Sequence, residues 1–141
     1  MASARHFARM PIPLIMLAAT FALCAEGPRT TCVVDGDTFW LNGEKVRIAD
    51  INAPETHSAG CAEEQALGDR ATNRLIVLLN AGPFTLETEG RATDRYGRAL
   101  RVVRRGSQSL GGVLVREGLA EPWRGRRSDW CAMLAVRTAS R

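Results

Sequence analysis

One long helical pattern, flanked on both sides by short strand patterns, constrains the fold of this chain more than any other feature. Across 61–80, apolar residues recur at three- and four-residue spacing and give one apolar face, formed by Ala66, Ala71, Leu75, Leu78 and Leu79. Gly82 and Pro83 then end the pattern, because neither residue favours a helix interior. The sequence therefore predicts one main helix over 61–80.

Short runs of strand-forming residues lie before and after this helix. Three precede it and two follow it: 31–34, 39–41, 44 to about 52, 84–89 and 98–104. Asn42 and Gly43 separate the second run from the third, and this dipeptide is the strongest short-range signal for a β-hairpin. Two short helices are predicted after the last strand, one at 109–117 that ends at Gly118 and one that begins near Ser128, which could cap it.

The order of these elements predicts the architecture. A chain of 141 residues has room for one domain of ordinary size. Three strands, a helix, two strands and further helices fit a mainly β protein with helices, which is an α+β fold. We predict an OB-fold, a five-stranded Greek-key barrel capped by helices, whose face and loops commonly bind oligonucleotides.

The first 25 residues differ in composition from the rest of the chain. Arg5, His6 and Arg9 precede an apolar run at 11–25 that carries no charge, as in a secretory signal. This run is shorter than the roughly 20 residues that cross a bilayer, although an uncleaved anchor is an alternative. We therefore expect residues 1–25 to be a signal peptide or N-terminal membrane anchor, residues 26–141 to be the domain, and the protein to be secreted or periplasmic.

The four cysteines agree with export, because small exported domains are commonly stabilised by disulfides. Of the three possible pairings we favour Cys61 with Cys131, since this pair would tie the C-terminal segment to the start of the main helix. Cys24 would then pair with Cys32. Cleavage after Ala25 would remove Cys24, whereas cleavage a few residues earlier would retain both pairs.

Charge is distributed unevenly along the predicted domain. Residues 26–90 carry eleven acidic and five basic side chains, whereas residues 91–141 carry four acidic and twelve basic side chains. A basic half suits a polyanionic ligand and an acidic half could supply a metal site, although a solvated surface could have the same distribution.

Four short motifs carry the most specific information: VVDGDTFW at 33–40, VRIADINAPET at 46–56, TDRYGRALRVV at 93–103 and LVREGLAEPW at 114–123. Each motif alone is a weak signal. Together, in this order and spacing, they resemble the staphylococcal-nuclease-like (thermonuclease) family. The resemblance extends over residues 31 to 123 and implies an OB-fold nuclease that hydrolyses phosphodiester bonds.

The resemblance implies three catalytic residues. Phosphodiester hydrolysis needs a carboxylate that takes a proton from water and fixed cations that stabilise charge on the phosphate oxygens. Glu55, held after Pro54, matches the family's general base, and Arg47 and Arg98 match its two phosphate-binding arginines. Outside this resemblance, the Pro-Glu pair would be an ordinary loop corner and either arginine an ordinary surface residue.

Calcium is the cofactor that the resemblance implies, and its site departs from the family pattern. Asp37 matches a calcium-binding aspartate, and Ala53 matches a residue whose backbone carbonyl binds the ion. Asn52 stands where the best-known relatives carry a second aspartate. An amide oxygen can still coordinate calcium, but one negative charge is lost. We therefore expect weaker metal binding unless Asp50 or Asp35 compensates.

The resemblance also implies residues that contact the substrate. Arg95 and Tyr96 match positions that contact bound nucleotide, and Trp123 lies near where relatives place an aromatic residue, with core packing as the alternative. Stacking on an aromatic ring tolerates any base, which suits a nuclease without sequence specificity. Asp94 is expected to order its own loop. Backbone phosphates, or solvent alone, are the expected neighbours of three further residues: Arg124, Arg126 and Arg127.

These residues predict an exported, metal-dependent endonuclease that acts on DNA and RNA, preferentially single-stranded, as a monomer without a stable protein partner. Cleavage of the P–O5′ bond would leave 3′-phosphates, as the resemblance implies. One alternative is a catalytically weak or inactive OB-fold module that binds nucleic acid or protein, which Asn52 favours and the three catalytic residues oppose. Another is a membrane-tethered nuclease, if residues 1–25 remain attached.

Overall fold

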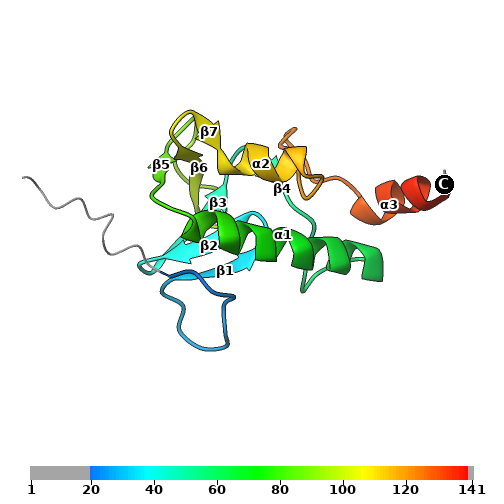
Figure 1. Cartoon of the computed structure of the whole chain (residues 1–141), viewed down its shortest axis with the longest axis horizontal. Helices are drawn as coiled ribbons and strands as arrows, with labels where there is room; N and C mark the ends of the chain where they lie inside the picture. The colour runs from blue at the N-terminus through cyan, green and yellow to red at the C-terminus, as the bar shows by residue number, and fades with distance from the viewer. Residues whose placement is uncertain (1–19, 140–141) are drawn as a thin grey trace, which may run out of the picture.

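The computed structural model describes residues 20–139, whose arrangement is shown in Figure 1. An antiparallel meander starts the sheet: β1 (Cys32–Asp35), β2 (Thr38–Leu41) and β3 (Glu44–Ile48). Asn42 and Gly43 connect β2 to β3 with φ angles of 51° and 83°. Positive φ at both central residues is what a tight type I′ turn requires, so the predicted hairpin is confirmed.

Two strands after the main helix extend the sheet on the side of β3. β6 (Ala99–Arg105) pairs in parallel with β3 and antiparallel with β5 (Thr85–Glu87), and β7 (Gln108–Ser109) pairs with the end of β6. The path β1-β2-β3-β6-β5 is the strand order of an OB-fold, and within residues 20–139 it is open between β1 and β5. The prediction of an α+β OB-fold is confirmed.

The third predicted strand, which should run to about Asn52, is interrupted at Asp50. β4 (Ile51–Asn52) leaves the main sheet and pairs with β8 (Glu121–Pro122) in a separate two-stranded sheet. Asp50 stabilises the turn, because its Oδ2 atom accepts a hydrogen bond from Ser109 Oγ at 2.5 Å. This turn brings the chain that follows β3 next to the segment that follows α2.

The main helix, α1 (Ala62–Asn80), is confirmed within one residue of its predicted start. Four of its five predicted apolar residues are buried, whereas Ala66 is exposed. Leu67 is buried in its place, because it lies four residues before Ala71 and therefore on the same helix face. Figure 1 shows α1 lying across the strands of the meander, and it packs most closely against β1.

Two shorter helices follow: α2 (Leu110–Arg116) and α3 (Trp130–Ala139). Ser109 caps α2 by accepting a hydrogen bond from Gly112 N. The predicted cap of α3 is wrong by one residue, because Asp129 Oδ1 accepts the hydrogen bond from Ala132 N at 3.0 Å, while Ser128 is bonded to Glu121. In Figure 1, α3 lies at the end of the molecule farthest from β5.

Residues before β1 are part of the packed domain. The Phe21 side chain is buried, and its ring meets the Phe39 ring edge-on with 5.8 Å between centroids. The backbone N and O atoms of Phe21 bond to the amide group of Asn80 at 2.8 and 2.9 Å. Most of the predicted signal peptide or membrane anchor, residues 1–19, lies outside the described residues.

Both favoured disulfides are present, Cys24–Cys32 and Cys61–Cys131. The first joins the N-terminal segment to β1, and the second joins the start of α1 to α3 across a sequence separation of 70. None of the helices between residues 20 and 139 is long and apolar enough to cross a membrane.

Candidate active site

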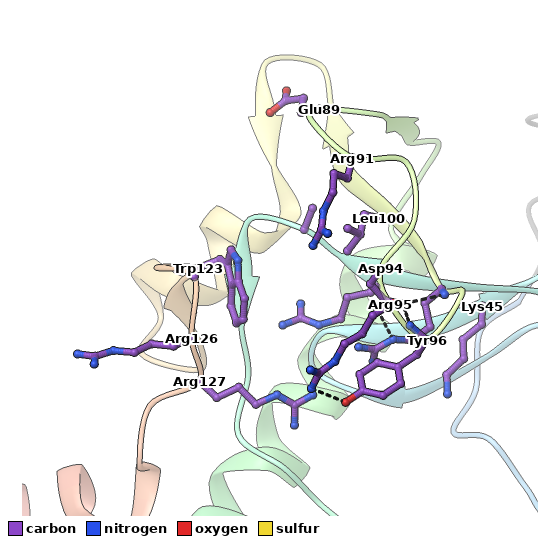
Figure 2. Close-up of a pocket in the computed structure, with 14 residues that line it drawn as sticks. Lys45, Glu89, Arg91, Asp94, Arg95, Tyr96, Leu100, Trp123, Arg126 and Arg127 are labelled. Carbon is purple, nitrogen blue, oxygen red and sulfur yellow. Dashed lines mark hydrogen bonds and ion pairs between the residues drawn. The ribbon is translucent and has the colours of Figure 1, made fainter.

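A groove of about 1010 Å³ is lined by β3, the loop between β5 and β6, and the segment after β8 (Figure 2). Two of its 14 lining residues are acidic, Glu89 and Asp94. Seven are basic: Lys45, Arg47, Arg91, Arg95, Arg98, Arg126 and Arg127. A groove with this excess of positive charge attracts polyanions such as nucleic acids.

Arg47, on β3, is the buried member of this basic set, with 5% of its surface exposed. Its Nη1 atom donates hydrogen bonds to the backbone carbonyls of Ile48 and, at 2.8 Å, Ile51. Its Nη2 atom lies 3.4 Å from Asp37 Oδ2, and its guanidinium carbon lies 5.5 Å from the centroid of the Trp123 ring. These contacts fix the guanidinium group at the groove.

Two buried aspartates, Asp35 and Asp37, lie at the turn between β1 and β2. Asp37 Oδ2 accepts a hydrogen bond from Ala53 N at 2.8 Å, and Asp35 Oδ1 accepts one from Asp37 N at 3.2 Å. Burial raises the pKa of Asp35 to about 8, and the charges of Asp37 and Glu55 act in the same direction. Two buried carboxyl groups therefore lie side by side at this turn.

Gly36, between these aspartates, allows the turn to approach the rest of the site. A Cβ atom at this position would lie 2.8 Å from the Cβ atoms of both Ala53 and Ala71. Only glycine leaves room for the DGDT turn to pack against the loop after β4 and against α1. This close approach brings Asp37 beside Ala53.

Glu55 lies in the loop between β4 and α1, and both its backbone and its carboxylate are held. Glu64 Oε2 accepts a hydrogen bond from Glu55 N at 3.0 Å, and Arg127 Nη1 donates one to Glu55 Oε1 at 2.7 Å. Partial burial raises the pKa of Glu55, although the positive charge of Arg127 acts in the opposite direction. A raised carboxyl pKa suits a group that must accept a proton during a reaction.

The predicted calcium ligands lie close together but form no complete cluster of charged ligands. Asn52 is buried, and its Nδ2 atom donates a hydrogen bond to Glu121 Oε1 at 3.0 Å. Asp37 is bonded to the backbone of Ala53, as described above. In the part of the chain that the structure describes, no three His, Cys, Asp or Glu side chains are grouped so that they could hold a metal.

Of the two aspartates that could compensate for Asn52, Asp50 is in the wrong place. Its Oδ2 atom is bonded to Ser109, and its Oδ1 atom lies where a Cβ atom of Gly111 would meet it, at the start of α2. Asp50 itself lies in the turn that separates β3 from β4. Asp35 is the aspartate that lies beside Asp37.

Asp94 orders the loop between β5 and β6, as predicted. Its Oδ1 atom accepts hydrogen bonds from Tyr96 N and Arg98 N, both at 2.9 Å, and its Oδ2 atom accepts one from Arg98 Nε at 2.5 Å. Although burial raises the pKa of Asp94, the hydrogen bonds from Arg98 and Tyr96 lower it below its ordinary value. The loop thereby holds Arg98 at the groove.

Tyr96 and Trp123 line the groove and are 66% and 42% exposed, so Trp123 is not a core residue. The Tyr96 ring lies 4.8 Å from the Arg95 guanidinium and 5.5 Å from that of Arg98. Arg95 Nη2 also donates a hydrogen bond to the Tyr96 hydroxyl at 2.7 Å. Each of the two predicted phosphate-binding arginines, Arg47 and Arg98, therefore has an exposed aromatic ring beside it.

The predicted site residues are only partly brought together. Arg47 and Arg98 both line the groove, whereas Glu55 and Asp37 do not and are connected to it by Arg127 and Arg47. Arg126 and Arg127 line the groove, and Arg124 does not. The catalytic and binding roles of these residues stay predictions.

Sequence reasoning missed Glu64 and the pairing of Arg127 with Glu55. Glu64 is the third residue of α1. A glutamate at this position commonly accepts hydrogen bonds from N–H groups before the helix, so its position could have indicated this role. No local pattern indicates the Arg127–Glu55 pair, because the two residues are 72 positions apart.

Several known proteins resemble part of this chain. Endonuclease YncB of Bacillus subtilis is 37% identical over 92 residues, which is 62% of this chain and 43% of that protein. Micrococcal nuclease of Shigella flexneri is 37% identical over 107 residues, or 65% of this chain and 55% of that protein. Thermonuclease of Staphylococcus intermedius is 33% identical over 92 residues, which is 62% of this chain and 54% of that protein. The chain thus spans about half the length of these relatives.

The family described as staphylococcal nuclease homologue matches residues 45–133. This match covers more than half of the chain and includes Arg47, Glu55, Arg98 and the whole groove. The strand order, the groove and the match agree, and the chain belongs to the staphylococcal nuclease homologue family.

Proposed function

We propose that this chain is a metal-dependent endonuclease that hydrolyses phosphodiester bonds of DNA and RNA. The observation that carries the proposal is the position of Glu55 next to a groove with seven basic lining residues. Glu64 holds the Glu55 backbone, and Arg127 holds its carboxylate. The relatives, which are an endonuclease, a micrococcal nuclease and a thermonuclease, support it.

In the proposed reaction Glu55 accepts a proton from water, and the water oxygen bonds to phosphorus as the P–O5′ bond breaks. O5′ takes up a proton and leaves as a 5′-hydroxyl, while the phosphate stays on the 3′ side. Arg47 and Arg98 donate hydrogen bonds to the phosphate oxygens on which charge develops. The fixed position of Arg47 supports this role, because a preorganised donor need not rearrange during the reaction.

Calcium is the proposed cofactor, and the donor atoms present fit a hard cation. Asp37, the Asn52 amide oxygen and the Ala53 carbonyl would hold it, since calcium prefers oxygen ligands. Burial first, and then the negative charges of Asp37 and Glu55, raise the pKa of Asp35, and a bound cation would act in the opposite direction. When bound, calcium would polarise the phosphate and orient the attacking water.

Single-stranded or locally opened nucleic acid is the proposed substrate, bound by a monomer without a stable protein partner. Tyr96 and Trp123 offer exposed rings on which unpaired bases could stack, and Arg95 lies against Tyr96. Bases inside a duplex are stacked on each other and cannot reach such rings. The basic groove would bind the phosphates of either sugar backbone, which supports action on both DNA and RNA.

The test is digestion of end-labelled single-stranded DNA and RNA by the full chain, in calcium and in a chelator. The proposal predicts calcium-dependent cutting inside the strand and products that end in 3′-phosphates. Cutting that is equally fast in the chelator would remove the metal from the proposal. An absence of cutting with every divalent metal tried would overturn the proposed activity.

A second candidate is a binding module that has lost efficient catalysis. The observation that favours it is the hydrogen bond between Asn52 and Glu121, which engages the residue that departs from the family pattern. In the test above, this candidate predicts salt-sensitive retention of the DNA without cleavage. Glu55, Arg47 and Arg98 oppose it, because a binder needs no carboxylate beside a phosphate.

Export is proposed as well, with removal of the N-terminal segment before Phe21 rather than after Ala25. Phe21 is buried against Phe39 and bonded to Asn80, and Cys24 is bonded to Cys32, so a cut after Ala25 would break all of these contacts. The mass of the protein recovered from the producing cell tests this. A mass that corresponds to a chain beginning at residue 26 would contradict this proposal. The mass of the full chain, recovered from a membrane fraction, would favour the tethered alternative.

A further inference from the structure

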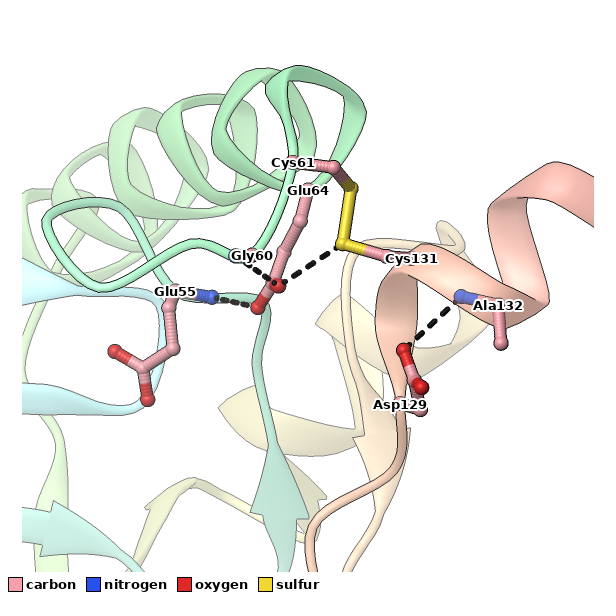
Figure 3. Close-up of a disulfide and its surroundings, with 7 residues drawn as sticks. All are labelled: Glu55, Gly60, Cys61, Glu64, Asp129, Cys131 and Ala132. Carbon is pink, nitrogen blue, oxygen red and sulfur yellow. Dashed lines mark hydrogen bonds between the residues drawn. A yellow bond between two sulfur atoms is a disulfide. The ribbon is translucent and has the colours of Figure 1, made fainter.

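The Cys61–Cys131 disulfide lies beside Glu55, and two sets of contacts connect them. Figure 3 shows the disulfide between the start of α1 and the start of α3, with Glu64 reaching from α1 toward the loop that carries Glu55. One set of contacts ends on the Glu55 backbone and the other ends on its carboxylate. Glu55 is therefore held at its backbone and at its carboxylate by residues of the two segments that this disulfide joins.

The first set runs through Glu64, a buried carboxylate on the first turn of α1. Its two oxygens accept hydrogen bonds from Glu55 N and Gly60 N, both at 3.0 Å. Cys131 Sγ lies 3.6 Å from the oxygen that is bonded to Gly60. The disulfide thus packs against the carboxylate that fixes the two ends of the Glu55 loop, and its removal would give Glu64 room to move.

The second set runs through Arg127, in the segment between β8 and α3. Glu121, on β8, holds the segment just after Arg127, because its carboxylate accepts hydrogen bonds from Ser128 N and Ser128 Oγ, the latter at 2.7 Å. The disulfide at Cys131, a little farther along the chain, joins the start of α3 to the start of α1. The Arg127 side chain is 54% exposed, so its ion pair with Glu55 is not enforced by burial, and exposed ion pairs contribute little without such restraint.

We propose that Glu64 and Arg127 are positioning residues for Glu55, and that the Cys61–Cys131 disulfide keeps both in place, so that nuclease activity requires the oxidised protein. This inference rests on the proposed function, since it assigns a regulation to the same site. Reduction by a dithiol breaks the S–S bond and gives two cysteine thiols, while the dithiol becomes a cyclic disulfide. The chain would then cut nucleic acid slowly in a reducing compartment and rapidly after oxidation.

The chain contains a matched control, the Cys24–Cys32 disulfide. This disulfide joins the N-terminal segment to β1 and shares no residue with either set of contacts to Glu55. If reduction acted only by weakening the fold, loss of either disulfide would reduce activity. If the position of Glu55 is what matters, only loss of Cys61–Cys131 will reduce kcat.

The experiment measures kcat and KM of the full chain on single-stranded DNA with calcium, before and after treatment with the dithiol. The Cys61→Ser/Cys131→Ser and Cys24→Ser/Cys32→Ser double variants are measured beside it. We expect reduction, or loss of the first pair, to lower kcat at least about tenfold with little change in KM, because a small displacement of a catalytic group slows the chemical step. The Cys24→Ser/Cys32→Ser variant should retain the kcat of the oxidised wild type.

Three variants that keep the disulfide separate the position of Glu55 from the loss of the covalent bond. Glu64→Gln leaves one acceptor oxygen for two N–H donors, and Arg127→Ala removes the ion pair with Glu55, so both should lower kcat. Arg127→Lys keeps the positive charge and should restore part of the loss, which a purely structural role for the segment would not produce. Equal kcat in Arg127→Ala and wild type would overturn the role of Arg127.

The outcomes separate this inference from the function on which it rests. An oxidised wild-type chain that does not cut DNA overturns the proposed function, and the inference falls with it. An oxidised chain that cuts, and a reduced chain that cuts with the same kcat, overturns the inference alone. A loss of kcat that is equal for both double variants would also overturn it, because the position of Glu55 would then not be the cause.

Discussion

The loop that carries Tyr96 lines the groove, and the loop that carries Glu55 is connected to the groove through Arg127. The two loops are held very differently. Glu55 is bonded through its backbone to Glu64 and through its carboxylate to Arg127, and its carbonyl packs on α1 at Gly68. Tyr96 is mostly exposed, and its loop is ordered chiefly by hydrogen bonds to Asp94 within the loop itself. One loop is fixed by elements distant in the sequence, and the other orders itself.

This difference corresponds to two different requirements. A general base must stay within a fraction of an ångström of the reacting water, which needs support from a rigid framework. A residue that stacks on bases of any sequence must adapt to them, and an exposed ring on a surface loop can do so. Substitutions near Glu55 should therefore change kcat, and substitutions near Tyr96 should change KM.

Apart from substitution of Glu55 itself, Arg47→Ala should have the largest effect. Its removal takes away a predicted transition-state donor and leaves the buried Asp37 unpaired. We expect kcat to fall by about 10²–10³-fold and the free energy of unfolding to fall by roughly 3–5 kcal/mol. Arg95→Ala, which removes an exposed arginine from the loop that carries Tyr96, should change the free energy of unfolding by less than about 0.5 kcal/mol. Denaturant titration and steady-state kinetics measure both, and equal destabilisation by the two variants would contradict the comparison.

Gly68→Ala should have the next largest effect, because it acts on the packing of the Glu55 loop alone. The new Cβ atom would lie 2.5 Å from the Glu55 carbonyl oxygen, so the loop must shift. We expect destabilisation of about 1–3 kcal/mol and a fall in kcat of roughly ten- to a hundredfold.

The control is Gly112→Ala on α2, where the nearest atom outside the helix backbone lies 3.7 Å away. Alanine favours a helix over glycine, so this variant should stabilise the protein by up to about 1 kcal/mol and leave kcat unchanged. If Gly68→Ala retained the kcat of the wild type, Glu55 would not depend on its contact with α1.

Tyr96→Ala should have the smallest effect on the enzyme and should change substrate binding alone. Loss of a stacking platform costs about 1–3 kcal/mol per base, so KM for single-stranded DNA should rise roughly tenfold while kcat stays the same. Tyr96→Phe keeps the ring and loses only the hydrogen bond from Arg95, so its KM should stay near that of the wild type. A fall in kcat without a change in KM would place Tyr96 in the chemical step.

Local patterns were sufficient for most of the fold. The Asn42–Gly43 turn and the helix over 61–80 depend on neighbouring residues or on short-range spacing, and both are confirmed. The break at Asp50 was not predictable, because the partner that stabilises it, Ser109, lies 59 residues away. The small sheet of β4 and β8 likewise pairs residues that are far apart in the sequence, such as Asn52 and Glu121.

The sequence indicated which residues are candidates for the site, but not which contacts hold them in place. Motifs identified Arg47, Glu55 and Arg98, whereas the residues that hold Glu55 belong to a helix and a C-terminal segment that only the fold brings together. The charge distribution was also a poor guide. Arg104 is paired with Glu87 and Glu89, and Arg105 donates to backbone carbonyls at the end of α1, so neither is available to a polyanion.

The most direct test of the account compares Glu55→Gln with the wild-type chain in two assays, binding of single-stranded DNA and single-turnover cleavage at saturating DNA with calcium. Glutamine has nearly the same shape and cannot act as the base. The account predicts a similar Kd and a cleavage rate lower by about 10²–10⁴-fold. Cleavage by Glu55→Gln at the wild-type rate would contradict the account, because the base would then be another residue.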